Sequence, residues 1–253
     1  MEPALRIEIN DVGPARPLRR HTFRNPDPGG TGADGGVAMA GSLTPGGIVE
    51  ACRQGMIPSA RPEERGVWIS PDPRAIIVPR NLHVSVGLEQ TIRAGQVYVS
   101  LDAAFEKVLA TCAEREEGSW ITAEYQRAYL RLHQLGWAHS FEVWTVSGEL
   151  AGGLYGLNVG GLFSIGSMFD GMPGASTVAV VAMARHLREV GVTLVDAREM
   201  TPDLAGLGAV PIARAEFVEW VGTISTRRVS FAGSPQDPDP VVSGSFAFIS
   251  PLM

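Results

Sequence analysis

The chain has 253 residues, of which 45% are hydrophobic and 19% are charged, and its formal net charge is −6. This composition is typical of a globular protein that buries a proper core in one domain or two modest ones, and it excludes an intrinsically disordered chain. The negative net charge argues against binding along a long nucleic-acid backbone, because such binding depends on neutralising the phosphates. It does not exclude a local arginine patch that binds one end of an RNA.

The apolar and cysteine patterns indicate a cytoplasmic protein. No run of about 18 apolar residues is present, so we expect no membrane span, and the N-terminus shows no secretory signal. The two cysteines, Cys52 and Cys112, lie within apolar helical patterns, which favours buried thiols in a reducing compartment. Two cysteines with five scattered histidines do not form a zinc-type cluster, so we expect no metal.

Residues 1–36 are predicted to form an N-terminal arm, because they are rich in Pro, Gly, Arg and Asp. One short strand is predicted from Leu5 to Ile9. The arm also carries a basic cluster, which is either a solvated surface or a phosphate contact. Its members are Arg16, Arg19, Arg20, His21 and Arg24.

Residues 37–79 are predicted to form a small N-terminal subdomain. A helix should begin at Thr44-Pro45, a capping hydroxyl followed by proline in the first turn, and end at Gly55. The segment Trp68 to Arg74 is interpreted as a rigid prolyl turn. A short apolar strand, Ala75 to Val78, is expected to follow.

Residues 80–222 are predicted to form an acyltransferase-like catalytic domain that begins with two helices. Asp102 is expected to cap the first, and Thr122 the second, which should end at Gly136. His133 lies off the apolar stripe of the second helix and is expected to be exposed and inert.

The apolar pattern then changes from a helical to an alternating period. The segments His139–Thr145, Glu149–Leu157 and Leu162–Phe169 are predicted to form an antiparallel meander. A helix over Ser176–Val190 and a buried strand over Val192–Asp196 should follow. This α+β order resembles the core of the GCN5-related N-acetyltransferase fold, a likeness of fold that says little about substrate.

The last part of the chain is predicted to contain three short elements and a tail. They are a helix over Asp203–Leu207, a strand over Val210–Ile212 and a helix over Ala215–Trp220. Residues 223–253 are predicted to form a C-terminal tail, in which the pattern of Phe246–Ile249 is compatible with an edge strand.

Several motifs occur in the order found in one known family. They are Gln54-Gly55-Met56-Ile57-Pro58, Trp68-Ile69-Ser70-Pro71-Asp72-Pro73-Arg74-Ala75, Ser119-Trp120-Ile121-Thr122, Ala138-His139-Ser140 with Glu142-Val143-Trp144, and Gly152-Gly153-Leu154-Tyr155-Gly156. On these motifs the chain resembles the leucyl/phenylalanyl-tRNA–protein transferases from about Gly36 to Val221, and it is identified as a divergent member of that family.

The resemblance implies a specific reaction. The family moves Leu, Phe or Met from the 3′ end of a charged tRNA onto the α-amine of a protein that begins with Arg or Lys. It uses neither metal nor coenzyme A, so the expected co-substrate is aminoacyl-tRNA and no cofactor is expected. Because the donor is an ester and the acceptor an amine, the site must orient the two and help a proton leave the amine.

The resemblance also implies roles for individual residues. Asp196 matches the Asp of an Asp-Cys-Gln motif that polarises the acceptor amine, and the alternative for it is a strand-end cap. Trp120 matches a tryptophan near the terminal adenosine of the tRNA, where stacking on an aromatic ring is worth about 1–3 kcal/mol. Core packing is the alternative for Trp120. Trp68 and Phe163 are further candidates for substrate binding.

One more motif implies the pocket for the transferred side chain. Met168 and Phe169 match the Met-Phe of the family's Glu-Ser-Met-Phe, which shapes that pocket. Plain core packing would be the default for such a pair at the end of a strand.

Two departures from the family pattern concern the acceptor. Asp-Cys-Gln is replaced by Asp196-Ala197-Arg198, and Gly166 takes the place of the Glu in Glu-Ser-Met-Phe. Arg198 cannot accept a hydrogen bond and carries a permanent charge, so it would repel a basic N-terminus. We therefore hypothesise an acceptor other than a basic N-terminus. A small-molecule amine bearing a carboxylate, phosphate or sulfamate would suit Arg198.

Three alternatives remain open. The first is ordinary aminoacylation of proteins that begin with Arg or Lys. The second is a non-catalytic binder of tRNA ends or peptides. The third is an acyl-coenzyme A transferase, for which the loop Asp170–Ser176 offers glycines but no pyrophosphate-binding pattern.

Overall fold

The computed structural model describes residues 7–9, 15–16, 18, 37–40, 43–59, 67–114 and 120–231. This part of the chain contains an eight-stranded mixed sheet, a three-stranded sheet and the helices around them, so the prediction of an α+β fold is confirmed. Most of the predicted basic cluster and the predicted strand at 246–249 lie outside the described residues.

The eight-stranded sheet is built around the predicted meander. Neighbouring strands run antiparallel except in the pairs β1–β6 and β9–β10, which are parallel. The turns of the meander contain Gly148 and Gly160, both with a positive φ that glycine adopts without strain. In sheet order the strands are β1 (Ile7–Ile9), β6 (Val97–Leu101), β7 (Ala138–Thr145), β8 (Leu150–Val159), β9 (Leu162–Asp170), β10 (Leu194–Arg198), β5 (Arg74–Ile77) and β11 (Val210–Ile212).

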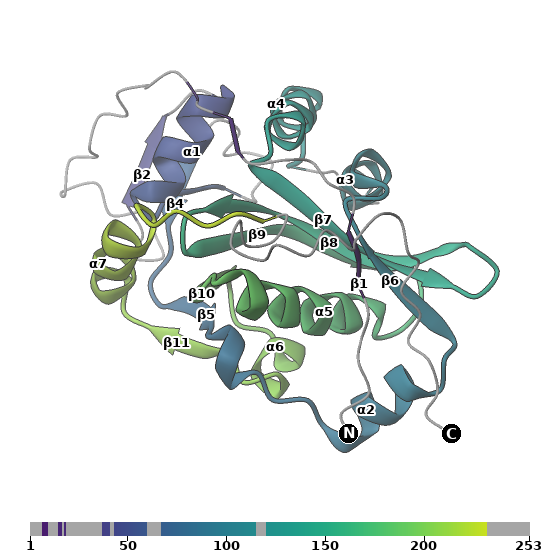
Figure 1. Cartoon of the computed structure of the whole chain (residues 1–253). Helices are drawn as coiled ribbons and strands as arrows, with labels where there is room; N and C mark the ends of the chain where they lie inside the picture. Colours follow the sequence, from purple (N-terminus) through teal and green to yellow (C-terminus); the bar gives the residue numbers. More distant parts are fainter. Residues whose placement is uncertain are drawn as a thin grey trace, which may run out of the picture.

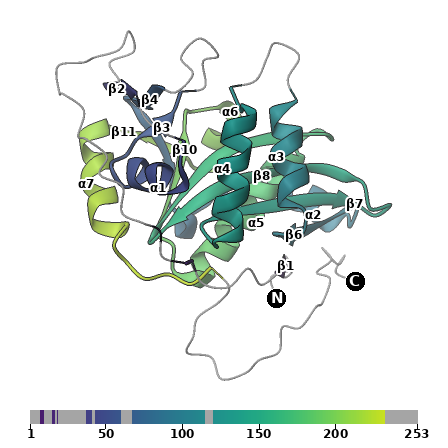
Figure 2. The ribbon, with the colours of Figure 1, turned by 90° about the horizontal axis from the view of Figure 1, so that it is seen from above.

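Helices cover both faces of this sheet (Figure 1). The helix α5 (Ala175–Val190) packs on one face, and α3 (Phe105–Ala113) and α4 (Ala123–Gln134) lie side by side on the other, as the view from above shows (Figure 2). The sequence of α5 is apolar nearly all round, which suits a helix buried between a sheet and further segments. The apolar core is therefore divided into two clusters, one on each face of the sheet.

The three-stranded sheet and α1 (Pro45–Arg53) lie beside the large sheet. Thr44 caps α1 as predicted, since its hydroxyl accepts a hydrogen bond from the amide of Gly47 at 3.2 Å. The interpretation of Trp68 as part of a turn was wrong, because it is buried within a strand. The strands, in sheet order, are β2 (Val37–Ala40), β4 (Val67–Ser70) and β3 (Ile57–Pro58).

The helices after β11 and before β6 differ in part from the prediction. The helix α6 (Pro202–Gly206) agrees with it, and α7 (Arg214–Ile224) extends past the predicted end at Trp220. The helix α2 (Val86–Arg93) and strand β6 were not predicted. No helix in the described part of the chain is long and apolar enough to cross a membrane.

Two expectations about the start of the catalytic domain were wrong. Asp102 does not cap α3: its φ is 60°, and its carboxylate accepts hydrogen bonds from His139 Nδ1 at 2.7 Å and from the Ser140 amide at 2.8 Å. His133 is neither exposed nor isolated. Its ring stacks on Phe105 at a centroid distance of 4.2 Å, and its Nδ1 lies 2.9 Å from the carbonyl of Ala138.

A second buried carboxylate, Glu142, joins β6 to β7. It accepts hydrogen bonds from the hydroxyls of Ser100 and Ser140, and the Trp144 indole donates to Ser100 at 2.8 Å. The polar residues of the Ala138-His139-Ser140 and Glu142-Val143-Trp144 motifs thus hold the strands together. Burial raises the pKa of Glu142 from 4.5 to about 7.

Glu142 should make stability depend on pH in a defined window. Because its pKa is higher in the folded than in the unfolded chain, its contribution is fully present below pH 4.5 and is lost as the pH rises through about 7. We expect Glu142→Gln to remove a decline of about 3 kcal/mol in the free energy of unfolding over this window. Urea unfolding of both proteins at a series of pH values measures this. The exposed Glu149→Gln is the control, and an unchanged slope in Glu142→Gln would refute the assignment.

Candidate active site

A buried ion pair joins the predicted catalytic residue Asp196 to Arg74. Arg74 Nε donates to Asp196 Oδ1 and Arg74 Nη2 to Oδ2, each at 2.7 Å, and both side chains are only 1% exposed. The two residues lie on β10 and β5, which are antiparallel neighbours in the sheet. The Arg74 guanidinium also lies 4.6 Å from the ring centroid of Phe217. Such a bidentate pair of charge-assisted hydrogen bonds is strong and fixes the orientation of both side chains.

The carboxylate of Asp196 has no free acceptor position. Besides the two bonds from Arg74, it accepts one from the Ser164 hydroxyl at 2.7 Å and one from the Arg198 amide at 3.0 Å. A carboxylate offers about four lone-pair sites, so all are used. Burial acts to raise the pKa of Asp196, but Arg74 and these hydrogen bonds hold it below its ordinary value. Asp196 is therefore an ionised group that positions its neighbours.

The side chain of Arg198 reaches from β10 to β9. A bulge between Asp196 and Arg198 and a φ of 65° at Arg198 set its direction. Its Nη1 donates to the carbonyl of Gly166 at 3.0 Å, and its guanidinium lies 5.3 Å from the ring centroid of Trp120. Burial acts to lower the pKa of Arg198, but its neighbours, the Asp196 carboxylate among them, hold it above its ordinary value, so the guanidinium stays charged.

Gly166 is the residue to which Arg198 donates, and it has no room for a side chain. It lies at a bulge in β9, between Ser167, which pairs with Tyr155, and Ile165, which pairs with Gly156. A Cβ atom on Gly166 would clash with the Tyr155 ring. The two departures that concern the acceptor are thus in direct contact through Arg198 Nη1 and the Gly166 carbonyl.

Three tyrosines surround this contact, and sequence reasoning missed their part in it. Tyr125 and Tyr129 stack at 4.4 Å, Tyr129 meets Tyr155 at 5.3 Å, and Tyr125 meets Trp120 at 4.9 Å between ring centroids. The hydroxyls of Tyr125 and Tyr155 are buried, and neither makes a hydrogen bond of good geometry within the described ranges, although the Tyr125 hydroxyl interacts with those of Tyr129 and Tyr155. Burial and mutual proximity raise the pKa of all three well above 10, so the phenols are neutral.

The predicted site residues do not all lie on one face of the sheet. Trp68, Trp120 and Phe169 pack in the cluster of apolar side chains on the face that carries Asp196 and Arg198. Phe163 and Met168 instead pack in the cluster beneath α5, on the opposite face. The structure therefore brings together Asp196, Arg198, Gly166 and Trp120, and it adds residues that were not predicted. These are Arg74, Ser164, Tyr125, Tyr129 and Tyr155.

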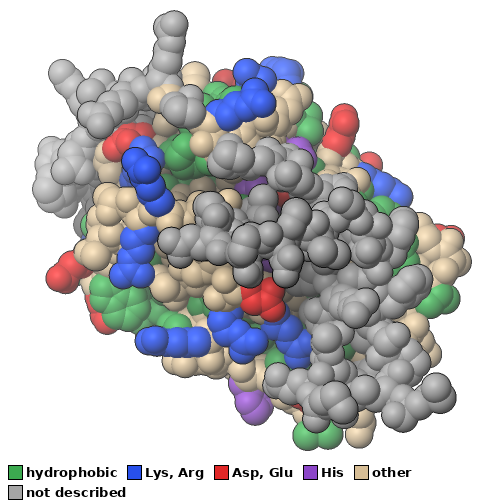
Figure 3. All heavy atoms as spheres, viewed as in Figure 1, with side chains coloured by type: hydrophobic (Ala, Val, Ile, Leu, Met, Phe, Trp, Pro, Cys, Tyr) green, Lys and Arg blue, Asp and Glu red, His purple; other side chains and the backbone are tan. Residues whose placement is uncertain are grey.

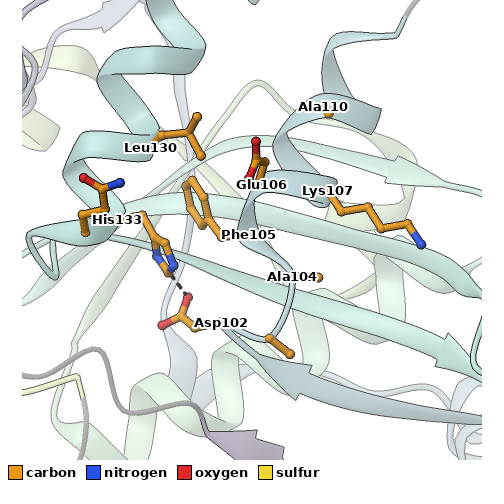
Figure 4. Close-up of a pocket in the computed structure, with 10 residues that line it drawn as sticks. Asp102, Ala104, Phe105, Glu106, Lys107, Ala110, Leu130 and His133 are labelled. Carbon is orange, nitrogen blue, oxygen red and sulfur yellow. Dashed lines mark ion pairs between the residues drawn. The ribbon is translucent and has the colours of Figure 1, made fainter.

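A separate cavity of about 620 Å³ opens between α3 and α4 (Figure 4). His133 points toward Asp102 in it, with Nδ1 3.7 Å from Oδ1, and Glu106 and Lys107 lie at its rim. None of the predicted site residues lines this cavity. In the described part of the chain, no group of three or more His, Cys, Asp or Glu residues is placed to hold a metal ion.

The charged side chains on the face shown in Figure 3 do not form one basic surface. Lys and Arg side chains stand at several separate places around this face, with acidic side chains among them. This agrees with the net charge of −6.

Comparison with known proteins identifies relatives. A family model described as leucyl/phenylalanyl-tRNA protein transferase matches residues 76–222. The chain is 46% identical over 197 residues to a protein named leucyl/phenylalanyl-tRNA–protein transferase from Anaeromyxobacter dehalogenans (strain 2CP-C), covering 76% of this chain and 84% of that protein. Proteins of the same name from Chromohalobacter salexigens and Edwardsiella ictaluri are 42% and 40% identical, covering 88% and 80% of this chain and 86% and 84% of theirs.

Breaking the Arg74–Asp196 pair should be costly. Arg74→Met leaves a buried carboxylate unpaired and Asp196→Asn leaves a buried guanidinium unpaired, so each should lower the free energy of unfolding by about 3–5 kcal/mol. The double variant should lose less than the sum of the two. The cost of Asp196→Asn should shrink as the pH falls below 3.8. A carboxylate whose pKa is lowered by folding contributes its full stabilisation at a pH above its ordinary pKa and loses it as the pH falls through the folded-state pKa.

Urea unfolding of the four proteins measures these costs. The exposed pair Arg53–Glu50, with side chains 40% and 31% exposed, is the matched control. Glu50→Gln should cost at most about 1 kcal/mol. Costs at Arg74 and Asp196 that are as small as this would contradict the structure of the site.

Proposed function

This chain belongs to the leucyl/phenylalanyl-tRNA–protein transferase family and is an aminoacyl-tRNA-dependent aminoacyltransferase, and we propose that its acceptor amine is not a basic N-terminus. The reaction joins the aminoacyl group of a charged tRNA to an acceptor amine. The amine nitrogen attacks the ester carbonyl, the bond from that carbon to the ribose oxygen breaks, and the amine proton ends on the released hydroxyl. The products are an amide and an uncharged tRNA.

The observation that carries the proposal is the charge of the site. Arg74 neutralises Asp196, and the phenols around Arg198 are neutral. Arg198 therefore keeps an uncompensated positive charge, which a carbonyl of Gly166 does not neutralise. An N-terminal Arg or Lys brought to this site would meet a like charge at low dielectric. Gly166 offers no acid to attract it, and the Tyr155 ring leaves no room for one.

Asp196 acts in this proposal as a positioning residue. All its acceptor positions are occupied, and it fixes the backbone of Arg198 through the amide of that residue. An ester donor and an amine acceptor need little activation, so orientation of the two supplies much of the rate. Trp120 is proposed to stack on the terminal adenosine of the tRNA, beside the Arg198 guanidinium.

Three further expectations belong to the proposal. The strand–strand–strand–helix–strand order of β7 to β10 supports a fold of the GCN5-related N-acetyltransferase type. We place the reaction in the cytoplasm, where charged tRNA is made. It would use aminoacyl-tRNA as co-substrate and no cofactor, with either a small amine or a peptide as acceptor.

Arg198→Gln should reverse the acceptor preference. The variant removes the like charge, so transfer to a peptide beginning with Arg should rise about 10- to 100-fold relative to transfer to a peptide beginning with an uncharged residue. The measurement is mass spectrometry of the products formed with a pool of charged tRNAs and an equimolar mixture of acceptors. Using the ratio of two products cancels any effect on tRNA binding.

The exposed Arg131→Gln on α4 serves as the matched control and should leave the ratio unchanged. A wild-type protein that prefers Arg-starting peptides, or a ratio that Arg198→Gln does not move, would show that the acceptor is the ordinary one.

A further inference from the structure

We infer that Arg198, together with the hydroxyls of Tyr125 and Tyr155, forms a subsite for a single carboxylate on the acceptor. The inference rests on the proposed function and narrows it. The acceptor would be an amine that also carries a carboxylate. A peptide whose first residue has a basic or an uncharged side chain does not present such a group.

Unused hydrogen-bond donors carry this inference. Nε of Arg198 and the hydroxyls of Tyr125 and Tyr155 are buried, and none makes a hydrogen bond of good geometry among the residues that the structure describes. The hydroxyl of Tyr125 does interact with those of Tyr129 and Tyr155, so the phenols lie close together with their bonding capacity only partly used. Buried polar groups without a partner are uncommon because each loses its hydration without compensation. One such group on the Arg198 guanidinium and two on the tyrosines beside it indicate that a ligand supplies the acceptors.

The contacts place these donors in one cluster. Arg198 and Tyr125 pack on the same Trp120 ring, at 5.3 Å and 4.9 Å from its centroid. Tyr155 fills the space beside Gly166, whose carbonyl accepts from Arg198 Nη1. Tyr129 lies between the other two phenols, at 4.4 Å from Tyr125 and 5.3 Å from Tyr155. A carboxylate with about four acceptor sites could take bonds from several of these donors at once.

Charge balance favours a carboxylate over a phosphate. Arg74 and Asp196 cancel each other, and the three phenols and Cys52 are neutral, since burial raises the pKa of that thiol to about 12. The site therefore holds one net positive charge. A monoanion neutralises it, whereas a phosphate, which carries nearly two negative charges at neutral pH, would leave a buried excess charge.

Two sources could supply such a carboxylate. One is the α-carboxylate of a free amino acid, and the other is the side chain of an Asp or Glu at the N-terminus of a peptide. Both present the same group to Arg198, and matched pairs of acceptors separate them. Glycine is compared with glycinamide, a peptide amide beginning with Glu with one beginning with Gln, and a phosphoserine peptide with a serine peptide.

The experiment measures transfer from a pool of charged tRNAs to each acceptor pair. In the wild-type protein we expect the acid of at least one carboxylate pair to be preferred about 10- to 100-fold in kcat/KM over its amide, which is the range for a charge-assisted hydrogen bond. Arg198→Gln should abolish the preference, and the exposed Arg131→Gln should keep it.

Tyr125→Phe and Tyr155→Phe test the same subsite without removing the charge. Each deletes a buried hydroxyl that makes no hydrogen bond of good geometry in the described part of the chain, so the free energy of unfolding should change little. The acid-to-amide ratio should nevertheless fall several-fold. A purely structural hydroxyl would give the opposite result, with lower stability and an unchanged ratio, and that result would overturn the subsite.

The outcomes separate this inference from the proposed function. Transfer to neutral amines in preference to both acids and Arg-starting peptides would refute the carboxylate subsite and leave the function standing. A preference for the phosphoserine peptide would refute the choice of carboxylate. Preferred transfer to Arg-starting peptides, or no transfer to any acceptor, would refute the proposed function and the subsite with it.

Discussion

The site depends on the buried ion pair between Arg74 and Asp196. Its partners are 122 residues apart in the chain and lie on adjacent strands, and Ser164 adds a bond from the strand on the other side of β10. Taking two charges out of water costs several kcal/mol per ion, which only near-ideal geometry and further hydrogen bonds offset. The four bonds to Asp196 provide that geometry. They fix β5, β9 and β10 against one another at the point where the site is built.

Asp196 also determines how Arg198 is presented. Its Oδ1 accepts the amide of Arg198, whose φ of 65° lies in the region that residues other than glycine rarely adopt. From this backbone the guanidinium reaches the Gly166 carbonyl and the Trp120 ring. The glycine and the arginine are then parts of one arrangement: Gly166 leaves room for Tyr155, and Tyr155 lines the space into which Arg198 extends. Relative to the family pattern, Gly166 in place of Glu removes a negative charge, and Arg198 in place of Gln adds a positive charge at the same place.

The order of the elements could be predicted from the sequence because it depends on local patterns. Thr44 and Thr122 cap helices, glycines mark the turns of the meander, and the change from helical to alternating period marks where β7 begins. Strand β6 was missed, although Val97, Val99 and Leu101 alternate, because the segment is short. Asp102 was taken for a cap since its type favours one, whereas its actual partners lie on β7, far along the chain.

The site could be predicted only in part, for the same reason. The family pattern pointed to Asp196 and Trp120, and the departures pointed to Arg198 and Gly166. No local sequence pattern indicates that Arg74 pairs with Asp196, or that the tyrosines of α4 lie near Arg198. Those contacts exist only once the sheet is assembled. The stripe of Tyr125 and Tyr129 looks like ordinary core spacing, and it does pack in the core. Three phenols where aliphatic residues would suffice are the one clue.

We propose that Asp196 stays ionised and positions the reacting groups, and that it does not take the proton from the amine. The most direct test is the pH dependence of kcat/KM for a series of acceptor amines with different pKa values. If Asp196 only positions, the acidic limb of the profile should follow the pKa of each acceptor amine, and Asp196→Asn should lower the rate without moving that limb. An acidic limb that lies at the same pH for every acceptor and disappears in Asp196→Asn would identify Asp196 as the base and contradict this role.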